Sequence, residues 1–273
     1  MISKNKYLIL RRLTQISLML LYIGGNVWGW NIIKGNLSSS KLFNFIPLSD
    51  PYAVLQMFVA GATISMDLLI GIAIITLFYA LIGGRVFCSW VCPVNMVTDL
   101  SNYIRRKAGF NKIQKRQPAS RAIRYYVIGI SLVISFALGI TAFEFISPVS
   151  MIHRGLIFSM GFGWAAIVII FLFDLFVLKH GWCGHICPIG GFYSIVGRFS
   201  LLRVNHDASK CTACMECKEV CPENEVLFMV SKTSEQVLMG ECTNCARCIE
   251  VCNDDALNFS IKKLNKGKQN EVN

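Results

Sequence analysis

Two runs of four cysteines near the end of the sequence constrain its fold more than any other feature. Both runs follow the spacing C-x2-C-x2-C-x3-C, with which a small bacterial ferredoxin holds two cubane iron–sulfur clusters. Three thiolates of one run hold three corners of a cluster, and the fourth thiolate comes from the other run. The sequence therefore predicts one [4Fe-4S] cluster at Cys211, Cys214, Cys217 and Cys252, and a second at Cys242, Cys245, Cys248 and Cys221.

The residues around these runs fit a ferredoxin better than a zinc protein. Zinc sites usually show paired C-x2-C knuckles rather than two evenly spaced quartets. Pro222 ends the first run as the ferredoxin pattern expects, whereas Asn253 stands where the second run would have its proline. We predict a small α+β bacterial two-cluster ferredoxin domain over residues 203–262, followed by a disordered polar tail over residues 263–273.

Long uncharged segments precede the cysteine runs. Hydrophobic residues make up 54% of the 273 residues, with a mean hydropathy of +0.51, which is too apolar for a typical soluble protein. Four blocks, at 13–30, 68–84, 125–143 and 156–173, are each long enough to cross a bilayer core of about 30 Å as a helix. We predict an α-helical membrane domain with four transmembrane helices over residues 13–198. No small-residue cleavage site follows the first block, so we expect it to remain as an anchor.

The basic residues predict the orientation of these helices. Lysines and arginines are concentrated in residues 1–12 and between the second and third blocks, whereas the other two connections contain few. The positive-inside rule then predicts a multi-pass protein of the bacterial inner membrane, with the N-terminal segment 1–12 and the C-terminus in the cytoplasm. The formal charge of +11 is explained by topology and by contact with anionic membrane lipid, so no nucleic acid partner is expected.

The remaining four cysteines form a second signal. A C-x3-C-P motif occurs at 88–93 and again at 183–188. If a helix continues through each motif, the i, i+4 spacing places both sulfurs on one face, and the proline stops or kinks the helix. We predict an additional metal or iron–sulfur site shared by the two motifs; the alternative is that these cysteines are only small buried residues near helix ends. The predicted ligands are Cys88, Cys92, Cys183 and Cys187.

The motifs belong to a longer internal repeat. Pro51 precedes Cys88 much as Pro148 precedes Cys183, so each half reads as a span, an outer turn with a proline, a second span and then C-x3-C-P. The membrane domain is therefore predicted to consist of two repeated helix pairs. Parallel repeats commonly place a shared site on the axis that relates them.

The order of these features resembles the NapH family, the ferredoxin-type quinol dehydrogenase components of periplasmic nitrate respiration, within a wider group that includes NosR and CcoG. The resemblance runs from the first span to about Lys262. It implies an iron–sulfur electron-transfer subunit of an oxidoreductase, with quinol as substrate. Electrons would pass from membrane quinol, together with a NapG-like ferredoxin partner, toward a periplasmic nitrate reductase.

Oxidation of quinol needs proton acceptors and hydrogen-bonding groups beside the spans. The candidates on the outer side are Gln56, Asp67, Glu144 and His153, and those on the inner side are Asp174 and His185. Gln56 and His153 follow the repeated prolines at the same distance, so both are predicted to point at one outer head group. Each of these residues could instead be an ordinary solvated side chain.

Two further functions stay open at this point. A copper-handling assembly factor of the CcoG type would use the C-x3-C-P thiolates for Cu(I), with Met66 or Met96 as additional soft ligands. A membrane redox sensor would use its clusters to report the state of the quinone pool. Copper dependence of an oxidase would favour the first, and loss of nitrate-linked quinol oxidation would favour the quinol dehydrogenase.

Overall fold

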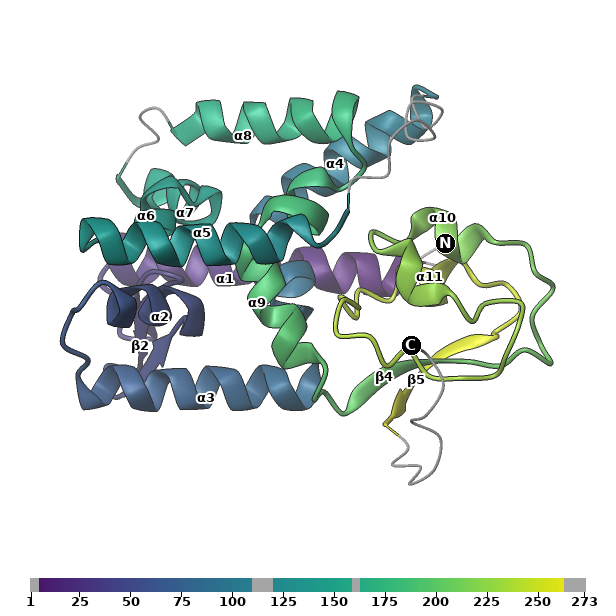
Figure 1. Ribbon diagram of the computed structural model, residues 1–273, viewed down its shortest axis with the longest axis horizontal. Coiled ribbons are helices and arrows are strands. Elements are labelled where there is room, and N and C mark those ends of the chain that lie inside the picture. The colour runs from purple at the N-terminus through teal and green to yellow at the C-terminus, as the bar shows by residue number, and fades with distance from the viewer. Residues whose placement is uncertain (1–4, 110–119, 159–162, 263–273) are drawn as a thin grey trace.

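The computed structural model describes residues 5–109, 120–158 and 163–262. The predicted tail at 263–273 lies outside the described residues, as does part of the predicted N-terminal segment. The protein is elongated and mostly helical (Figure 1). Its long helices run along the longest axis, with a small cysteine-rich domain at one end and a three-stranded sheet with short helices at the other.

The first half of the helical region contains a helix, a sheet, two further helices, a π-helical turn and an amphipathic helix. In chain order these are α1 (Lys6–Val27), β1 (Ile33–Gly35), β2 (Ser39–Leu42), β3 (Ile46–Ser49), α2 (Pro51–Val59), α3 (Met66–Ile82), η2 (Phe87–Val91) and α4 (Val94–Lys107). Local sequence explains two of the starts. Asp50 caps α2 by accepting a hydrogen bond from the Ala53 amide, and Ser65 caps α3 by accepting one from Leu68.

The second half repeats this plan without the sheet. Its elements are α5 (Ile123–Leu138), α6 (Ala142–Ile146), α7 (Pro148–Phe158), α8 (Gly163–Leu172), η4 (Phe173–Val177), η5 (Trp182–Ile186) and α9 (Pro188–Gly197). Gly139, in the left-handed region at φ 64°, ends α5. Helix α9 crosses between α3 and α5 in Figure 1 and contacts both. Its Tyr193 ring packs against Tyr79 and Phe87 in a buried aromatic cluster.

One helix in the described part of the chain, α1, is long and apolar enough to cross a membrane. Three further apolar helices, Met66–Ile82, Ile123–Leu138 and Gly163–Val177, are shorter. All four overlap the predicted spans, although α1 begins before the basic pair Arg11 and Arg12 rather than after it. Four transmembrane helices therefore remain a prediction.

The segment between the first two apolar helices contains structure that the sequence analysis did not predict. Strands β1, β2 and β3 form an antiparallel sheet in which Ile33 pairs with Leu42 and Ser40 with Leu48. Gln56 and its helix α2 follow directly. The strands are only three or four residues long, which is too short to show a clear alternation of apolar and polar residues.

The C-terminal domain is a small α+β unit, as predicted. It contains β4 (Leu202–His206), α10 (Glu216–Val220), η6 (Asn224–Leu227), α11 (Arg247–Val251) and β5 (Leu257–Ile261), with β4 and β5 antiparallel. Its own core is formed by residues such as Val204, Leu227 and Leu257. A loop of this domain lies directly on α9, because Gly240 lacks a Cβ that would collide with the backbone carbonyl of Ser194.

Candidate iron–sulfur electron-transfer site

The structure brings each predicted set of four ferredoxin cysteines together around its own small cavity. One cavity is lined by Cys211, Cys214, Cys217 and Cys252. The other is lined by Cys221, Cys242, Cys245 and Cys248. In both, three cysteines come from one run and the fourth from the other, which is the exchange that the spacing predicts. The two sets fit the ligand requirement of two four-iron clusters.

The backbone between these cysteines is shaped in the same way in both runs. Ala213 and Met215 in the first run, and Asn244 and Ala246 in the second, all have positive φ angles between 46° and 62°. Left-handed conformations are costly for residues with a side chain, and they cluster where function requires them. Alternating conformations of this kind turn successive backbone N–H groups toward one point, the arrangement that stabilises anionic iron–sulfur centres.

The two C-x3-C-P motifs adopt one shared conformation. Each forms a single π-helical turn, closed by a hydrogen bond from Cys92 N to Phe87 O (3.0 Å) in η2 and from Cys187 N to Trp182 O (2.9 Å) in η5. Both second cysteines are extended, with φ near −65° and −62° respectively. The helix therefore widens into a π-helical turn instead of continuing as an α-helix through the motif, and it ends before each proline, as expected. π-helical turns are often found at functional sites.

All four C-x3-C-P cysteines line one small buried cavity, together with apolar side chains such as Phe87 and Val149. Burial, followed by the neighbouring sulfur of Cys88, raises the pKa of Cys187 to about 12. The pKa of Cys92 is raised by burial and by its neighbours Cys88 and Cys187. Four thiolates this close would repel each other unless a cation lay between them, so the set suits a bound metal centre.

Within the described ranges, no three histidine, cysteine or acidic side chains are arranged to hold a single metal ion. The three sets of cysteines therefore suit multi-iron clusters rather than a single ion. Of the two methionines that could assist copper, Met66 lies away from the C-x3-C-P cysteines: it is exposed at the first residue of α3, whereas Cys88 follows the other end of that helix.

The membrane-domain cysteines lie beside one of the ferredoxin sets. Cys88, Cys183 and Cys245 line a common small cavity, together with Glu223 and Arg85. Cys245 belongs to the set that includes Cys221. The shared cavity links the C-x3-C-P site to the set that includes Cys245. That set is linked in turn to the more exposed set that includes Cys214, because each run supplies one cysteine to the other run's set. The three cysteine sets are therefore arranged in series.

A buried carboxylate holds the two domains together at this junction. Glu223 is 1% exposed and forms ion pairs with Arg85 (2.5 Å), Arg121 (2.5 Å) and Arg124 (3.5 Å). The Arg85 guanidinium also donates to the carbonyl oxygens of Cys183 (2.8 Å) and Glu241 (3.0 Å). Nearby charge on Glu223 raises the pKa of Arg85 in spite of the opposing effect of burial. Arg85 thus joins both halves of the repeat to the ferredoxin domain.

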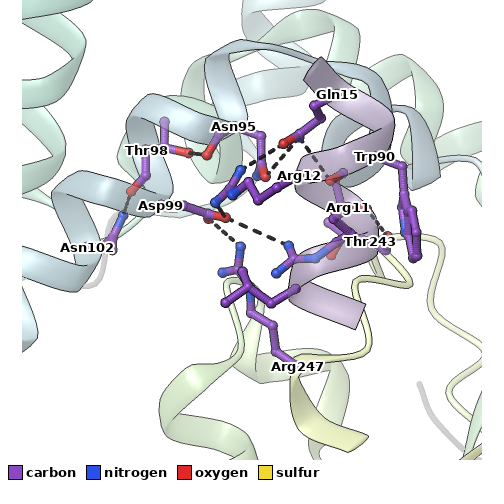
Figure 2. Close-up of polar contacts among 12 residues, drawn as sticks. Arg11, Arg12, Gln15, Trp90, Asn95, Thr98, Asp99, Asn102, Thr243 and Arg247 are labelled. Atoms are coloured by element: carbon purple, nitrogen blue, oxygen red, sulfur yellow. Dashed lines mark hydrogen bonds and ion pairs between the residues drawn. The ribbon is translucent and has the colours of Figure 1, made fainter. Parts of the chain in front are cut away.

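A second, largely buried carboxylate, Asp99 of α4, joins the first half of the helical region to the ferredoxin domain on another side. It pairs with Arg12 at 2.5 Å and with Arg11 at 3.7 Å, both on α1, and with Arg247 at the start of α11 (Figure 2). Burial would raise the pKa of Asp99, but Arg247, His180 and the two α1 arginines together lower it below its ordinary value. The side chain therefore stays charged at neutral pH.

Comparison with known proteins places these features in a family. A model described as "4Fe-4S binding domain" matches the chain twice, at residues 65–111 and 156–205, and one described as "4Fe-4S dicluster domain" matches residues 203–253. The "Ferredoxin-type protein NapH" of Haemophilus influenzae is 44% identical over 82% of this chain and 77% of its own length. The "Methylamine utilization ferredoxin-type protein MauN" of Methylorubrum extorquens is 42% identical over 88% of this chain and 83% of its own length.

The chain belongs to the NapH and MauN family of ferredoxin-type proteins. This confirms the resemblance to NapH and extends it to MauN. The NapH protein of Escherichia coli is similar at 43% identity over 82% of this chain. The double match of one model also confirms that the region before the ferredoxin domain is repeated, with one C-x3-C-P motif in each copy. No solved structure matches this NapH and MauN family chain.

Two of the predicted quinol contacts of this family member, Gln56 and His153, are buried among different neighbours. Gln56 is fully buried and its carbonyl oxygen accepts a hydrogen bond from the Phe143 amide (3.0 Å). His153 is 2% exposed and packs its ring edge-to-face against Tyr22 at 4.7 Å, and burial lowers its pKa to about 4. A role for either residue in binding quinol stays a prediction.

Three of the other four candidates have individual partners. Glu144 accepts hydrogen bonds from Ser38 (2.5 Å) and Ser150 (2.6 Å). Asp67 is exposed and pairs with Lys41 at 3.2 Å. On the inner side, Asp174 accepts a hydrogen bond from the Trp182 amide (3.1 Å), and His185 is buried within η5. A role for these four residues in binding quinol stays a prediction.

Sequence analysis missed the two carboxylates that join the domains. The basic residues between the second and third apolar helices were explained by topology and lipid contact, but Arg105 and Arg124 are buried. Arg105 donates to the backbone carbonyl of Asp174 (3.0 Å). The sequence did contain a weak signal of a buried ion pair. Glu223 follows Cys221 and Pro222 directly, and a carboxylate without a counter-charge would be repelled there by a negatively charged iron–sulfur centre.

Proposed function

We propose that this protein is a multi-pass inner-membrane electron-transfer subunit that passes electrons from quinol to a redox partner through three cysteine-bound iron–sulfur centres. The observation that carries the proposal is the serial placement of the cysteine sets, with Cys88, Cys183 and Cys245 around one cavity. Two of the centres are [4Fe-4S] clusters of the ferredoxin domain, and the third is held by the C-x3-C-P cysteines.

Several features support a location in the membrane. The outward faces of α3 and α5 are apolar, with exposed side chains such as Leu77, Val133 and Phe136. A solvent-facing surface of this kind would be unfavourable in water but suits lipid. Helices α3 and α5 contain 17 and 16 residues, which is short for a span, so tilt is not needed and local thinning of the bilayer would accommodate them.

The chain's own residues define what each centre does. Bound clusters would supply one-electron carriers at the three places. Oxidation of one quinol to quinone releases two electrons and two protons, so at least two such carriers receive the electrons. Glu223 and Asp99 hold the ferredoxin domain fixed against the helices, which keeps the cysteine sets at constant separation. The C-x3-C-P cysteines are buried or half-buried, which limits the access of water to that site.

The relatives' names share a ferredoxin type, and one of them also states a metabolic use. NapH is named for its ferredoxin type alone, and MauN for methylamine utilisation. We propose the shared step, electron transfer with membrane quinol, for this chain. By resemblance to NapH, its partners are a NapG-like ferredoxin and a periplasmic nitrate reductase chain. The alternatives of copper handling and redox sensing gain no specific support from the geometry of Cys88 and its neighbours.

A potentiometric EPR titration of the purified full-length protein tests the proposal, combined with iron and acid-labile sulfide counts. We expect about twelve irons per chain if the C-x3-C-P centre is a further cubane, against about eight for the ferredoxin domain alone. Addition of a short-chain quinol should reduce part of the EPR-detectable centres. Failure of any quinol to reduce wild-type protein that dithionite does reduce would disprove the quinol dehydrogenase role.

A further inference from the structure

A large cavity lies at the junction of α1, α4 and the ferredoxin domain, away from the predicted outer quinol contacts. Its volume is about 880 Å³. Sites for small molecules and cofactors usually have volumes of about 300–1,000 Å³ and apolar walls with a few polar groups. The apolar part of the wall comes from all three elements and consists of Leu8, Met96, Val97, Leu100, Tyr103, Val220 and Val251.

We propose that this cavity binds the head group of a membrane quinol. The proposal rests on the quinol dehydrogenase function proposed above and locates its substrate. It differs from the outer site suggested by Gln56 and His153, since the cavity is at the ferredoxin end of the helices.

One residue of the cavity wall, Arg11, has buried donors without hydrogen-bond partners. This arginine is only 1% exposed. Its Nε has no hydrogen-bond partner, and its Nη1 has only the long ion pair to Asp99 at 3.7 Å. Unsatisfied buried donors are unfavourable and call for an acceptor. The oxygen of a quinone or quinol ring is an acceptor of the required kind, and Figure 2 shows Arg11 beside Asp99 and Arg247.

Further polar groups complete the same wall. Asn102 and His180 are almost fully buried and both line the cavity. The Asn102 side-chain nitrogen lies 3.3 Å from His180 Nδ1, which fixes the orientation of the ring. A flat ring with an oxygen at each end would thus meet cationic and amide groups in the interior and apolar side chains toward the opening.

The cavity adjoins the cysteine sets that would accept the electrons. Val220 in its wall precedes Cys221, and Val251 precedes Cys252, so the wall includes neighbours of ligands from both ferredoxin sets. Arg247 and His180 also line the small cavity between the C-x3-C-P site and Cys245. A ring bound here would lie close to all three predicted centres.

Helix α4, which contributes to the cavity wall, has the character of a helix at a membrane surface. Helix α4 has exposed apolar side chains, Leu100 and Tyr103, and ends in Arg106 and Lys107. A helix with one apolar face and a basic end is typical of the membrane interface. A quinol with an isoprenoid tail could therefore enter from the inner leaflet without leaving lipid.

Anionic lipid is the main competing occupant, because the phosphate of a head group would also pair with Arg11 and Arg12. Two features favour quinol. Asp99 already neutralises part of the arginine charge, and the wall beyond the arginines is apolar and adjoins the cysteine sets. A lipid phosphate would be attracted by the arginine charge, but its binding would make no use of the nearby cysteine sets.

Photolabelling tests the site independently of turnover. The full-length protein in nanodiscs of neutral phosphatidylcholine is labelled with an azide-bearing short-chain benzoquinone, and labelled peptides are identified by mass spectrometry. Leu100→Trp fills the opening, and Ile130→Trp on α5 is the matched control, because the two side chains are 54% and 58% exposed. We expect label on α1, α4 or residues 247–253 in wild-type protein, and about tenfold less in Leu100→Trp.

A kinetic measurement on the same variants supports the labelling. Leu100→Trp should raise the quinol concentration for half-maximal cluster reduction about tenfold, whereas Ile130→Trp should change it less than about twofold. Dithionite should reduce all three proteins equally. Label on α2 or α7, equal labelling of both variants, or displacement of the label by phosphatidylglycerol but not by unlabelled quinone would each overturn the proposal while leaving quinol oxidation intact. Failure of the proposed function would instead abolish reduction by quinol in the wild type.

Discussion

The ferredoxin domain and the helical domain both build four-cysteine sites from a repeated motif, but they divide the ligands differently. In the ferredoxin domain each site takes three cysteines from one run and one from the other. In the helical domain each half contributes two cysteines to a single site. The first arrangement places most of a site within one local turn, whereas the second creates a site only where two separate halves pack together.

The backbone conformation around the cysteines also differs between the two domains. The ferredoxin loops use left-handed residues such as Ala213 and Ala246 to wrap around a centre. The C-x3-C-P motifs use a π-helical turn and leave the wrapping to neighbouring helices. A loop that encloses its own ligand set tolerates change elsewhere in the molecule. A site formed between helices depends on the whole helical domain, and the following variants test this contrast.

The largest effect is expected from single cysteine changes. Cys183→Ser and Cys88→Ser should each remove all iron of the helical-domain centre, since a shared four-ligand site loses its geometry with either half. Cys214→Ser should remove one ferredoxin cluster, about four irons, and leave the other. Iron counts and EPR of the three purified variants measure this. Wild-type iron content in Cys88→Ser and Cys183→Ser would return these cysteines to a purely structural role.

The next effect concerns the junction between the regions. Glu223→Ala leaves Arg85, Arg121 and Arg124 buried without their counter-charge, and removing one partner of a buried ion pair costs about 3–5 kcal/mol. We expect the ferredoxin domain to become susceptible to limited proteolysis near residue 200 and to detach at lower temperature. Glu225→Ala is the control, because that side chain is 65% exposed in its ion pair with Arg121.

A smaller effect on stability is expected from glycine substitutions at alanines with left-handed and with ordinary backbone conformations. Ala246 has φ 61°, where glycine is less strained than alanine, so Ala246→Gly should preserve the clusters and stabilise the loop by up to about 1 kcal/mol. Ala208 has no positive φ angle, so Ala208→Gly in the same domain relieves no strain and should lower stability slightly. Thermal unfolding followed by loss of cluster absorbance gives the comparison. A destabilised Ala246→Gly variant would argue against conformational strain in the loop.

The smallest effect is expected at the end of the helical domain that lies opposite the ferredoxin domain. Lys41 and Asp67 form an exposed ion pair, with side chains 55% and 63% exposed. Such pairs contribute about 0.2–1 kcal/mol, and Asp67→Asn should change the melting temperature little. Reduction of the clusters by quinol should stay within about twofold of wild type, since the proposed cavity is elsewhere. A larger loss of quinol-dependent reduction with an unchanged melting temperature would favour the outer site predicted from the sequence.

Sequence spacing predicted the grouping of all twelve cysteines because those contacts follow from short local periods and from a visible repeat. The conformation of the C-x3-C-P turns was not predictable in this way. An i, i+4 pattern is typical of an α-helix, and a one-residue widening at Cys92 or Cys187 leaves no mark in the spacing.

The polar contacts between the domains were missed for a different reason. Arg85 and Glu223 are 138 positions apart, and a charged residue in the sequence carries no sign of its burial. The positive-inside rule accounts for arginines near membrane helices without requiring that they have ion-pair partners. The arginines that pair with Glu223 and Asp99 were therefore attributed to topology. The cavity beside Arg11 was likewise hidden, because its wall is drawn from three segments distant in the chain.

The close contact of the ferredoxin loop with α9 has a consequence for genetics. A Cβ at Gly240 would meet the carbonyl of Ser194, and one at Gly84 would meet that of Tyr193, so neither position has room for alanine. A single base change converts a glycine codon to an alanine codon. Loss-of-function alleles recovered in an unbiased screen should therefore fall at these two glycines as well as at cysteine codons, although neither glycine touches a ligand of any centre.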